Sequence, residues 1–321
     1  MKMFTHRGLI ALALLTTATA TGFSQARPSS GGIVVFGTSL SDSGNAFSLL
    51  GATSTPPDYL VDPLLVPSAP YARGGQHFSN GATWVEQFAR SRGLAGSVRP
   101  AFASSDINAT NYAVGAARAR EDGINVNLAT QVDRFLQQSS GVANPDSLYV
   151  IEMGGNDIRD ALRASATGGN PGLVLTQANI AIAGSVQILY AAGARRFLIW
   201  RAPDVGMTPA LRTLDQFSPG AAQGATALTQ AFNDGLDGVV VQLSGLPGID
   251  IVRLDAFALL HALVANPEAF GLTNVTTACI TPDIAPFTCT SPDEFLFWDG
   301  IHPTKAVHAI VAQEAAAALA R

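Results

Sequence analysis

Cysteine is scarce in this sequence, with only Cys279 and Cys289 present among 321 residues. So low a count excludes a disulfide-rich scaffold, and no histidine lies at a spacing from them that is typical of a zinc site. Because the chain begins with a segment of the kind that directs export, the two cysteines indicate one disulfide closing a short loop. Two free thiols and half of a metal site are weaker alternatives, and we expect no metal.

Charged residues are also scarce, at 13% of the chain, against about 25% in a typical domain. The 19 Lys and Arg residues are outnumbered by 24 Asp and Glu residues, and the formal net charge is −5. Nucleic-acid binding requires clustered basic residues, and no basic patch or charged tail is visible. We therefore expect no nucleic-acid partner.

Long apolar runs are confined to the N-terminus. A basic start precedes an apolar run at 8–20 that is too short to span a bilayer comfortably, and residues 24–26 form a small-x-small cleavage site. These features predict a signal peptide over residues 1–26, with a second possible cleavage site at 18–20. A retained anchor is disfavoured because threonines interrupt the run. We expect a secreted or periplasmic mature chain without a transmembrane span.

Beyond the leader, apolar strands alternate with amphipathic helices, and no repeat or linker marks a second domain. Strands that are nearly continuous in apolar residues are typical of a parallel sheet covered on both faces. We therefore predict an α/β fold, with residues 27–321 forming a single domain. The expected strands are 33–36, 110–115, 148–153, 196–200 and 249–254, and the expected helices are 127–135, 176–192, 221–243 and those that begin near 83, 256 and 303.

The stretch from Leu49 to Gly75 contains five prolines interleaved with apolar residues. Proline excludes a helix or a central strand, so a long loop is expected. Such a loop most often packs on the domain surface. The functional alternative is an apolar wall or lid beside the site, because long ordered loops are often functional.

Ser39 lies where a predicted strand meets the next element. The apolar run at 33–36 ends at Gly37, a residue that permits a tight turn, and a helix is expected to follow Ser39 directly, capped by Ser41, Asp42 or Asn45. A hydroxyl beside the free N–H groups of such a turn is suited to stabilise a developing oxyanion. We interpret Ser39 as a nucleophile, and the alternative is an ordinary turn with capping serines.

Asp299 and His302 supply the partners that a serine nucleophile needs. The hydroxyl requires a base, and the base is oriented by a carboxylate three residues away in sequence, within reach across one turn. His77 lies in a loop and is retained as a candidate wall residue, whereas His261 and His308 fit amphipathic helices. Ser39, Gly115 and Asn156 each follow a predicted strand, so they are expected at one edge of the sheet, where α/β proteins bind ligands.

Four sequence blocks in this order resemble those of the GDSL, or SGNH, family of esterases and lipases. The blocks are Gly37-Thr38-Ser39-Leu40-Ser41-Asp42-Ser43-Gly44-Asn45, Asn111-Tyr112-Ala113-Val114-Gly115, Gly154-Gly155-Asn156-Asp157 and Asp299-Gly300-Ile301-His302. Further stretches, at Phe78-Ser79-Asn80-Gly81 and Phe297-Trp298, are similar to its secreted lipase-like branch. Some members of that branch carry a C-terminal barrel, and none is expected here because the sequence ends about one helix after His302.

The resemblance implies a flavodoxin-like three-layer α/β/α sandwich and hydrolysis of carboxylic esters without a cofactor. Ser39 matches the nucleophile, His302 the general base and Asp299 the residue that orients it. The backbone N–H groups of Ser39 and Gly115 and the side chain of Asn156 match the oxyanion-hole donors. The serine is not in a Gly-x-Ser-x-Gly frame, so an α/β-hydrolase elbow is not indicated.

Two positions depart from the family pattern. Thr38 stands where the family has Asp, and we expect Thr38→Asp to change stability or rate only modestly. Ala116 stands where the family often repeats glycine, which leaves Gly115 as the donor expected from that pair.

The leading hypothesis is a secreted esterase or lipase that cleaves small-molecule or lipid esters through an acyl-serine intermediate. Acyl transfer to an alcohol or sugar, or carbohydrate O-deacetylation, is the enzymatic alternative, distinguished by product analysis with added acceptor. A non-catalytic binding protein is disfavoured because Ser39, Asp299 and His302 together have little structural purpose. The apolar loop from Leu49 to Gly75 favours medium or long acyl chains.

Overall fold

The computed structural model describes residues 31–57, 59–103 and 106–321, so the predicted leader lies outside the described residues. Its main sheet is parallel, with strand order β1-β2-β3-β4. The strands are β1 (Ile33–Gly37), β2 (Leu148–Glu152), β3 (Arg196–Arg201) and β4 (Asp250–Asp255). The predicted α/β fold with a central parallel sheet is confirmed.

The segment at 110–115 is not the regular strand that we predicted, although it runs parallel to the free edge of β1. Val35 accepts from the Tyr112 N–H at 2.8 Å and donates to the Thr110 carbonyl at 2.9 Å. The ladder ends at Gly37, whose carbonyl accepts from the Val114 N–H at 3.1 Å but whose own N–H donates to the side chain of Gln131 at 2.9 Å instead of to this segment. With this segment counted, the strand order is that of flavodoxin-like sheets, which bind ligands beside the first strand.

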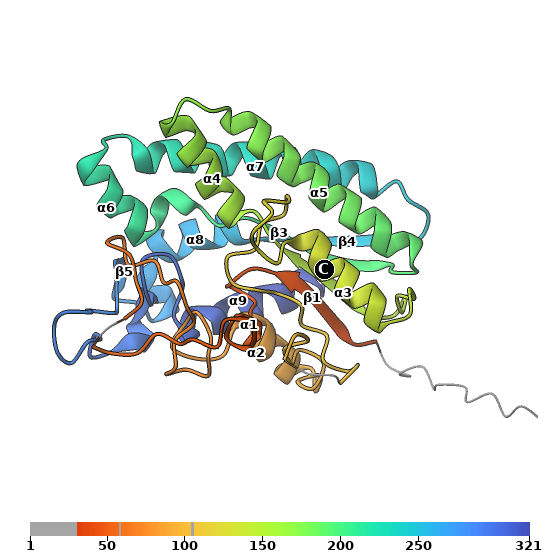
Figure 1. The fold of residues 1–321 in the computed structure, drawn as a ribbon, viewed down its shortest axis with the longest axis horizontal. Coiled ribbons are helices and arrows are strands. Elements are labelled where there is room, and N and C mark those ends of the chain that lie inside the picture. The colour runs from red at the N-terminus through yellow and green to blue at the C-terminus, as the bar shows by residue number, and fades with distance from the viewer. Residues whose placement is uncertain (1–30, 58, 104–105) are drawn as a thin grey trace, which may run out of the picture.

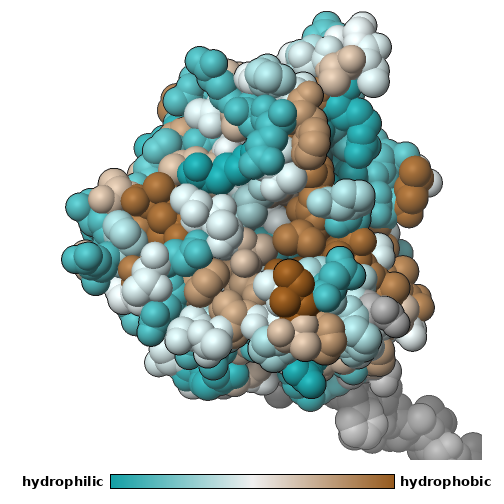
Figure 2. Space-filling model, turned by 90° about the vertical axis from the view of Figure 1, so that its left-hand side faces the viewer, coloured by the Kyte–Doolittle hydropathy of each residue, from teal (hydrophilic) through white to brown (hydrophobic). Residues whose placement is uncertain are grey.

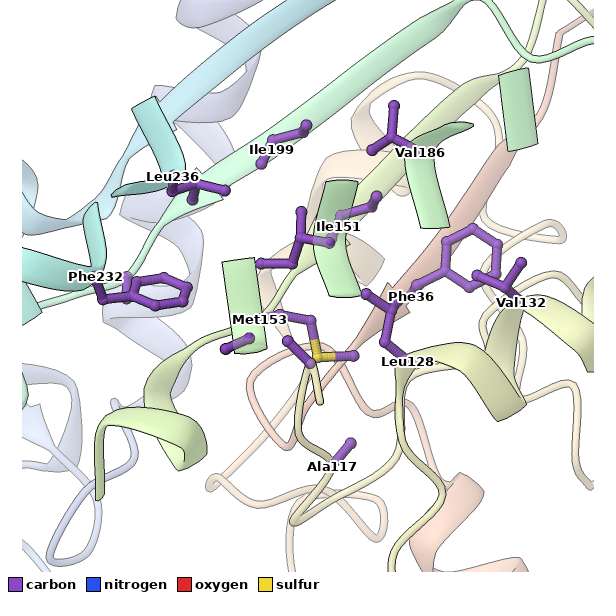
Figure 3. Packing of buried hydrophobic residues seen from close by; sticks show 14 of the residues in the cluster. Phe36, Ala117, Leu128, Val132, Ile151, Met153, Val186, Ile199, Phe232 and Leu236 are labelled. Carbon is purple, nitrogen blue, oxygen red and sulfur yellow. The ribbon is translucent and has the colours of Figure 1, made fainter. Parts of the chain in front are cut away.

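Helices cover both faces of the sheet (Figure 1). Val34 and Phe36 of β1 face the helices α3, α4, α5 and α7, whereas Ile33 and Val35 face α2 and α9. Figure 3 shows the first of these layers, in which side chains of the sheet interdigitate with those of α3, α5 and α7. The helices are α1 (Asn45–Leu50), α2 (Trp84–Ser91), α3 (Leu128–Gln138), α4 (Gly155–Ala166), α5 (Pro171–Ala191), α6 (Pro209–Phe217), α7 (Ala221–Leu243), α8 (Ala256–Ala265) and α9 (Lys305–Ala318).

Several elements differ from the sequence-based prediction. Helix α4 begins directly after β2 and α6 begins at a proline capped by Thr208, and neither helix was expected. A second, two-stranded parallel sheet, β5 (Asn274–Ala278) and β6 (Phe295–Phe297), was also missed. Pro303 precedes the Thr304 cap of α9 and is not in its first turn. The stretch from Leu49 to Gly75 is a loop beyond α1, as predicted.

Among the described residues, α5 is the one helix long and apolar enough to cross a bilayer by length and composition. It contacts α3, α4 and α7, and its inward residues Leu175, Ile182 and Val186 belong to the core above the sheet. This packing is that of a helix covering a sheet, so its composition is weak evidence for a membrane span.

Candidate active site

Ser39 lies in a tight turn at the carboxyl end of β1. Gly37 is required before it, because a Cβ at that position would lie 2.9 Å from a carboxylate oxygen of β2. The Ser41 N–H closes the turn by donating to the Thr38 carbonyl at 3.1 Å. The expected helix does not follow directly, since α1 begins only at Asn45. The N–H groups beside Ser39 are therefore those of a turn and not of a helix terminus.

The structure brings Ser39, His302 and Asp299 into one hydrogen-bonded chain. Ser39 Oγ lies 2.8 Å from His302 Nε2, and His302 Nδ1 lies 2.7 Å from Asp299 Oδ2. The aspartate is fully buried and the histidine is 3% exposed. A buried carboxylate beside one imidazole nitrogen and a hydroxyl beside the other is the geometry needed to activate a serine.

Asp299 is fixed by its own turn. Its Oδ1 accepts from the Ile301 N–H at 2.8 Å and from the His302 N–H at 2.7 Å, which leaves Oδ2 to face the imidazole. Trp298 N–H donates to the His302 carbonyl at 2.8 Å and closes the loop. The spacing of three residues therefore places carboxylate and imidazole together, as the sequence predicts.

Tyr71 is a site residue that the sequence did not reveal. Its hydroxyl donates to Asp299 Oδ2 at 2.9 Å, and the side chain is almost fully buried. Burial, together with the neighbouring carboxylate, holds the pKa of the Tyr71 hydroxyl well above its usual range, so it remains a donor. No local motif signals this contact, because 228 residues separate the partners.

The loop from Leu49 to Gly75 forms the back of this site. The Gly300 N–H donates to the Leu65 carbonyl at 2.9 Å, and a Cβ at Gly300 would lie only 2.0 Å from the Leu64 carbonyl oxygen. Cys279 and Cys289 are disulfide-bonded, and their loop packs with Tyr71 and Trp298 in the same cluster. Loop and disulfide therefore support Asp299 and His302 from behind.

Gly115 does not offer a free donor. Its N–H donates to Asp42 Oδ2 at 2.8 Å, and this buried carboxylate also accepts from the N–H groups of Gly44, Asn45 and Ala46. Burial raises the pKa of Asp42, and these four N–H groups oppose the rise. The sequence-based expectation for Gly115 thus conflicts with the hydrogen bonding that the structure gives it.

Ala116, the residue after Gly115, has a backbone N–H that is free to donate to an oxyanion. Among the described residues, no acceptor pairs with the N–H of Ala116 or of Ser39. Ala116 has a φ of 65°, the left-handed region that usually requires glycine, which fits the glycine often found there in the family. Asn156, in the first turn of α4, lines the same pocket as Ser39 and has one amide hydrogen engaged by the Ala117 carbonyl at 2.9 Å.

A second buried carboxyl, Glu152, lies beneath the turn of Ser39. It accepts from the Thr38 N–H at 2.9 Å and from the Thr38 and Ser41 hydroxyls at 3.0 and 3.1 Å. Trp84 Nε1 donates to Ser41 Oγ at 2.9 Å and extends this network. Burial raises the pKa of Glu152 to about 7, against the hydrogen bonds from Thr38 and Ser41. An aspartate at position 38, as in the family pattern, would therefore place its carboxylate against that of Glu152.

The remaining described histidines have other partners. His77 Nε2 lies 3.0 Å from Glu86, and His261 Nε2 lies 2.9 Å from Asp204. His308 accepts from the Trp84 N–H at 3.1 Å, and burial lowers its pKa to about 3. Within the described part of the chain, no group of three His, Cys, Asp or Glu side chains is arranged to hold a metal ion.

A parallel sheet with a Ser-His-Asp chain at its carboxyl edge is the arrangement of a serine hydrolase. The comparison with known families gives the particular class: the model of the GDSL-like lipase/acylhydrolase family matches residues 33–315. The chain belongs to this family, whose members have the SGNH hydrolase fold and act on carboxylic esters.

Three relatives illustrate the range of similarity. Lipase 1 of Photorhabdus luminescens is 28% identical over 65% of this chain, but the match spans only 42% of that protein. A GDSL esterase/lipase of Arabidopsis thaliana is 26% identical over 87% of this chain and 89% of its own length. Phosphatidylcholine-sterol acyltransferase of Aeromonas hydrophila is 27% identical over 96% of this chain and 94% of its own length.

Proposed function

We propose that this protein cleaves carboxylic esters through an acyl-serine intermediate formed on Ser39. The single observation that carries the proposal is the hydrogen-bonded chain from Ser39 Oγ through His302 to the buried Asp299. His302 Nε2 takes the hydroxyl proton as Oγ attacks the ester carbonyl. Asp299 holds the imidazole in the required tautomer and stabilises its positive charge.

The tetrahedral oxyanion is stabilised, in this proposal, by the N–H groups of Ser39 and Ala116 and by the second amide hydrogen of Asn156. The support for Ala116 in place of Gly115 is that its N–H has no acceptor among the described residues, whereas that of Gly115 is engaged by Asp42. His302 then protonates the leaving alcohol, and water deacylates Ser39 by the same steps in reverse order.

The test is hydrolysis of p-nitrophenyl esters by the wild type and by Ser39→Ala. We expect kcat to fall by several orders of magnitude, because removal of a triad member leaves only residual catalysis. Ser48→Ala is the matched control, since Ser48 is an exposed serine on the neighbouring helix α1. Equal activity of Ser39→Ala and wild type would exclude the mechanism.

Acyl transfer to an alcohol is the second candidate, and one observation favours it. The Aeromonas hydrophila relative, which matches 96% of this chain, is named an acyltransferase. Both reactions proceed through the same acyl-serine, so the acceptor decides between them. Product analysis with an added long-chain alcohol would give a new ester if transfer competes with hydrolysis, and only free acid if it does not.

We also propose that the chain is exported, that residues 1–26 are removed and that residues 27–321 form one domain. The disulfide between Cys279 and Cys289 supports an oxidising compartment, because such bonds rarely persist in the cytosol. Intact-mass measurement of protein recovered from the periplasm or medium tests this directly. A mass that includes residues 1–26 would contradict it.

A further inference from the structure

A cavity of about 110 Å³ leads from Ser39 and His302 into the interior. Its deep part lies between two separate apolar clusters. Trp200 and Val311 belong to the cluster beneath the sheet, whereas Leu260, Leu263 and Leu296 belong to the cluster between α8 and β6. Protein interiors are normally close-packed, so a void that separates two clusters and reaches a nucleophile indicates a binding site.

The deep walls are mostly apolar, and Trp200 Nε1 is a buried donor there that has no hydrogen-bond partner among the described residues. His308 uses its Nδ1 on the Trp84 backbone, and Asp204 accepts from the Gly206 N–H at 3.0 Å and faces His261. The polar groups left for an occupant at the reacting end include Ser39, Asn156 and Arg159, whose guanidinium lies beside the Asn156 side chain. Figure 2 shows the face toward which the strands of the main sheet point, where apolar residues gather in the middle between polar areas. A hydrocarbon chain with one polar end matches this gradient.

No described residue of the loop from Leu49 to Gly75, for which an apolar wall was the functional alternative, lines this cavity. Its contacts lie behind the turn of Asp299 and Gly300. The apolar wall is built instead by α8, α9 and the ends of β3 and β6. A preference for longer acyl chains would therefore depend on these helices and strands and not on the loop from Leu49 to Gly75.

We propose that this cavity binds the acyl chain of the ester and that its depth sets the preferred chain length. The inference rests on the proposed acyl-serine mechanism. The acyl group stays attached to Ser39 after the first step, whereas the alcohol must leave and water must enter. The apolar cavity fits the part that stays, and the open side of Ser39 fits the part that leaves.

The decisive variants change the cavity in opposite directions. Ala256→Phe, at the start of α8, fills it, and Ala258→Phe is the matched control because Ala258 is exposed on the same helix and lines no part of it. Leu263→Ala deepens it, and Leu236→Ala is the control because Leu236 is equally buried on the opposite face of the sheet. All variants are assayed on a series of p-nitrophenyl esters from acetate to palmitate.

Ala256→Phe, which fills the cavity, should lower kcat/KM for the octanoate ester at least about tenfold relative to the acetate ester. Each methylene that is buried contributes about fourfold to affinity. Deepening should move the optimum to longer chains, which a purely structural defect would not do. The controls should keep the wild-type profile. Equal losses on acetate and octanoate, or a changed preference among alcohols at constant acyl chain, would overturn the assignment.

A binding measurement separates this proposal from the mechanism. A fluorescent dodecanoic acid should bind Ser39→Ala as it binds the wild type, and Ala256→Phe should weaken binding about tenfold whereas Ala258→Phe should not. If Ala256→Phe weakens binding but the protein has no esterase activity, the cavity is a chain-binding site and the proposed reaction is wrong. Binding that is indifferent to Ala256→Phe would reject the cavity.

Discussion

The nucleophile and its base are held by different kinds of structure. Ser39 follows β1, a fully buried strand, and a network of buried side chains, Glu152 and Asp42 among them, fixes the backbone around it. His302 lies in an irregular loop that is held by another loop, through Tyr71, and by the neighbouring disulfide. The regular sheet therefore positions the nucleophile, whereas long-range packing between loops positions the base and its carboxylate.

The largest expected effect disturbs the nucleophile side. Thr38→Asp brings a second carboxylate to within hydrogen-bond distance of the buried Glu152, where Thr38 Oγ1 now donates at 3.0 Å. An uncompensated buried charge costs about 3 to 5 kcal/mol, so we expect strong loss of stability and activity. This exceeds the modest effect expected from sequence. Denaturant unfolding and ester hydrolysis measure both.

The control for Thr38→Asp removes the charge of its partner, Glu152. Adding Glu152→Gln to Thr38→Asp should restore most of the lost stability, because only one carboxylate then remains. Thr38→Ser should stay close to wild type, since the hydroxyl and the N–H still reach Glu152. A stable and active Thr38→Asp single variant would contradict the proposed conflict of charges.

The matching test of the base side removes the disulfide. Replacing Cys279 and Cys289 with serine should reduce the free energy of unfolding by about 3 kcal/mol, the value expected for a loop of this size. Activity per folded molecule should fall as well, because the disulfide loop packs with Tyr71 and Trp298. An unchanged denaturation midpoint would show that the bond does not stabilise this half of the site.

The pH dependence of stability tests the Ser39 side of the site through the buried carboxyl group of Glu152. The pKa of Glu152 is about 7 in the folded chain against an ordinary value of 4.5, so the folded state binds this proton more tightly. Stability is therefore lost as pH rises from about 4.5 through 7, by on the order of 2 to 3 kcal/mol. Glu152→Gln should flatten this decline, measured by denaturant unfolding at several pH values. An identical decline in the variant would exclude Glu152 as its source.

The smallest effect comes from the tyrosine that links the loop to the triad. Tyr71→Phe removes one hydrogen bond to Asp299, worth about 1 kcal/mol, and should lower kcat/KM about fivefold. Without this donor Asp299 is held less firmly against His302. Ester hydrolysis at substrate concentrations below KM measures the effect. An unchanged kcat/KM would show that this hydrogen bond does not help to position Asp299.

The sequence was sufficient where the signal is local. Apolar strands between helices predict the sheet and its two covered faces, and the spacing of Asp299 and His302 predicts a contact that one turn makes. Helix α6 has a local signal in the sequence, a threonine cap followed by proline. Helix α4 was missed because Gly154 and Gly155 resemble a turn that merely ends a strand.

The remaining features depend on contacts that no local pattern encodes. Tyr71 meets Asp299 across 228 residues, and Thr38 meets Glu152 across 114 residues. Gly115 looked like a free donor because nothing in its neighbourhood shows that Asp42 accepts its N–H. The cavity beside Ser39 lies between two apolar clusters that Leu259 joins, which is a property of the packed chain and not of any segment.

The most direct test of the central claim is covalent labelling with a fluorophosphonate that reacts with activated serines. We expect a single adduct, mapped by peptide mass spectrometry to Ser39, in wild type and in Ser48→Ala. No adduct should form in Ser39→Ala, and its rate of formation should fall sharply in His302→Ala. An adduct on another serine, or persistent labelling of Ser39→Ala, would show that Ser39 is not the nucleophile.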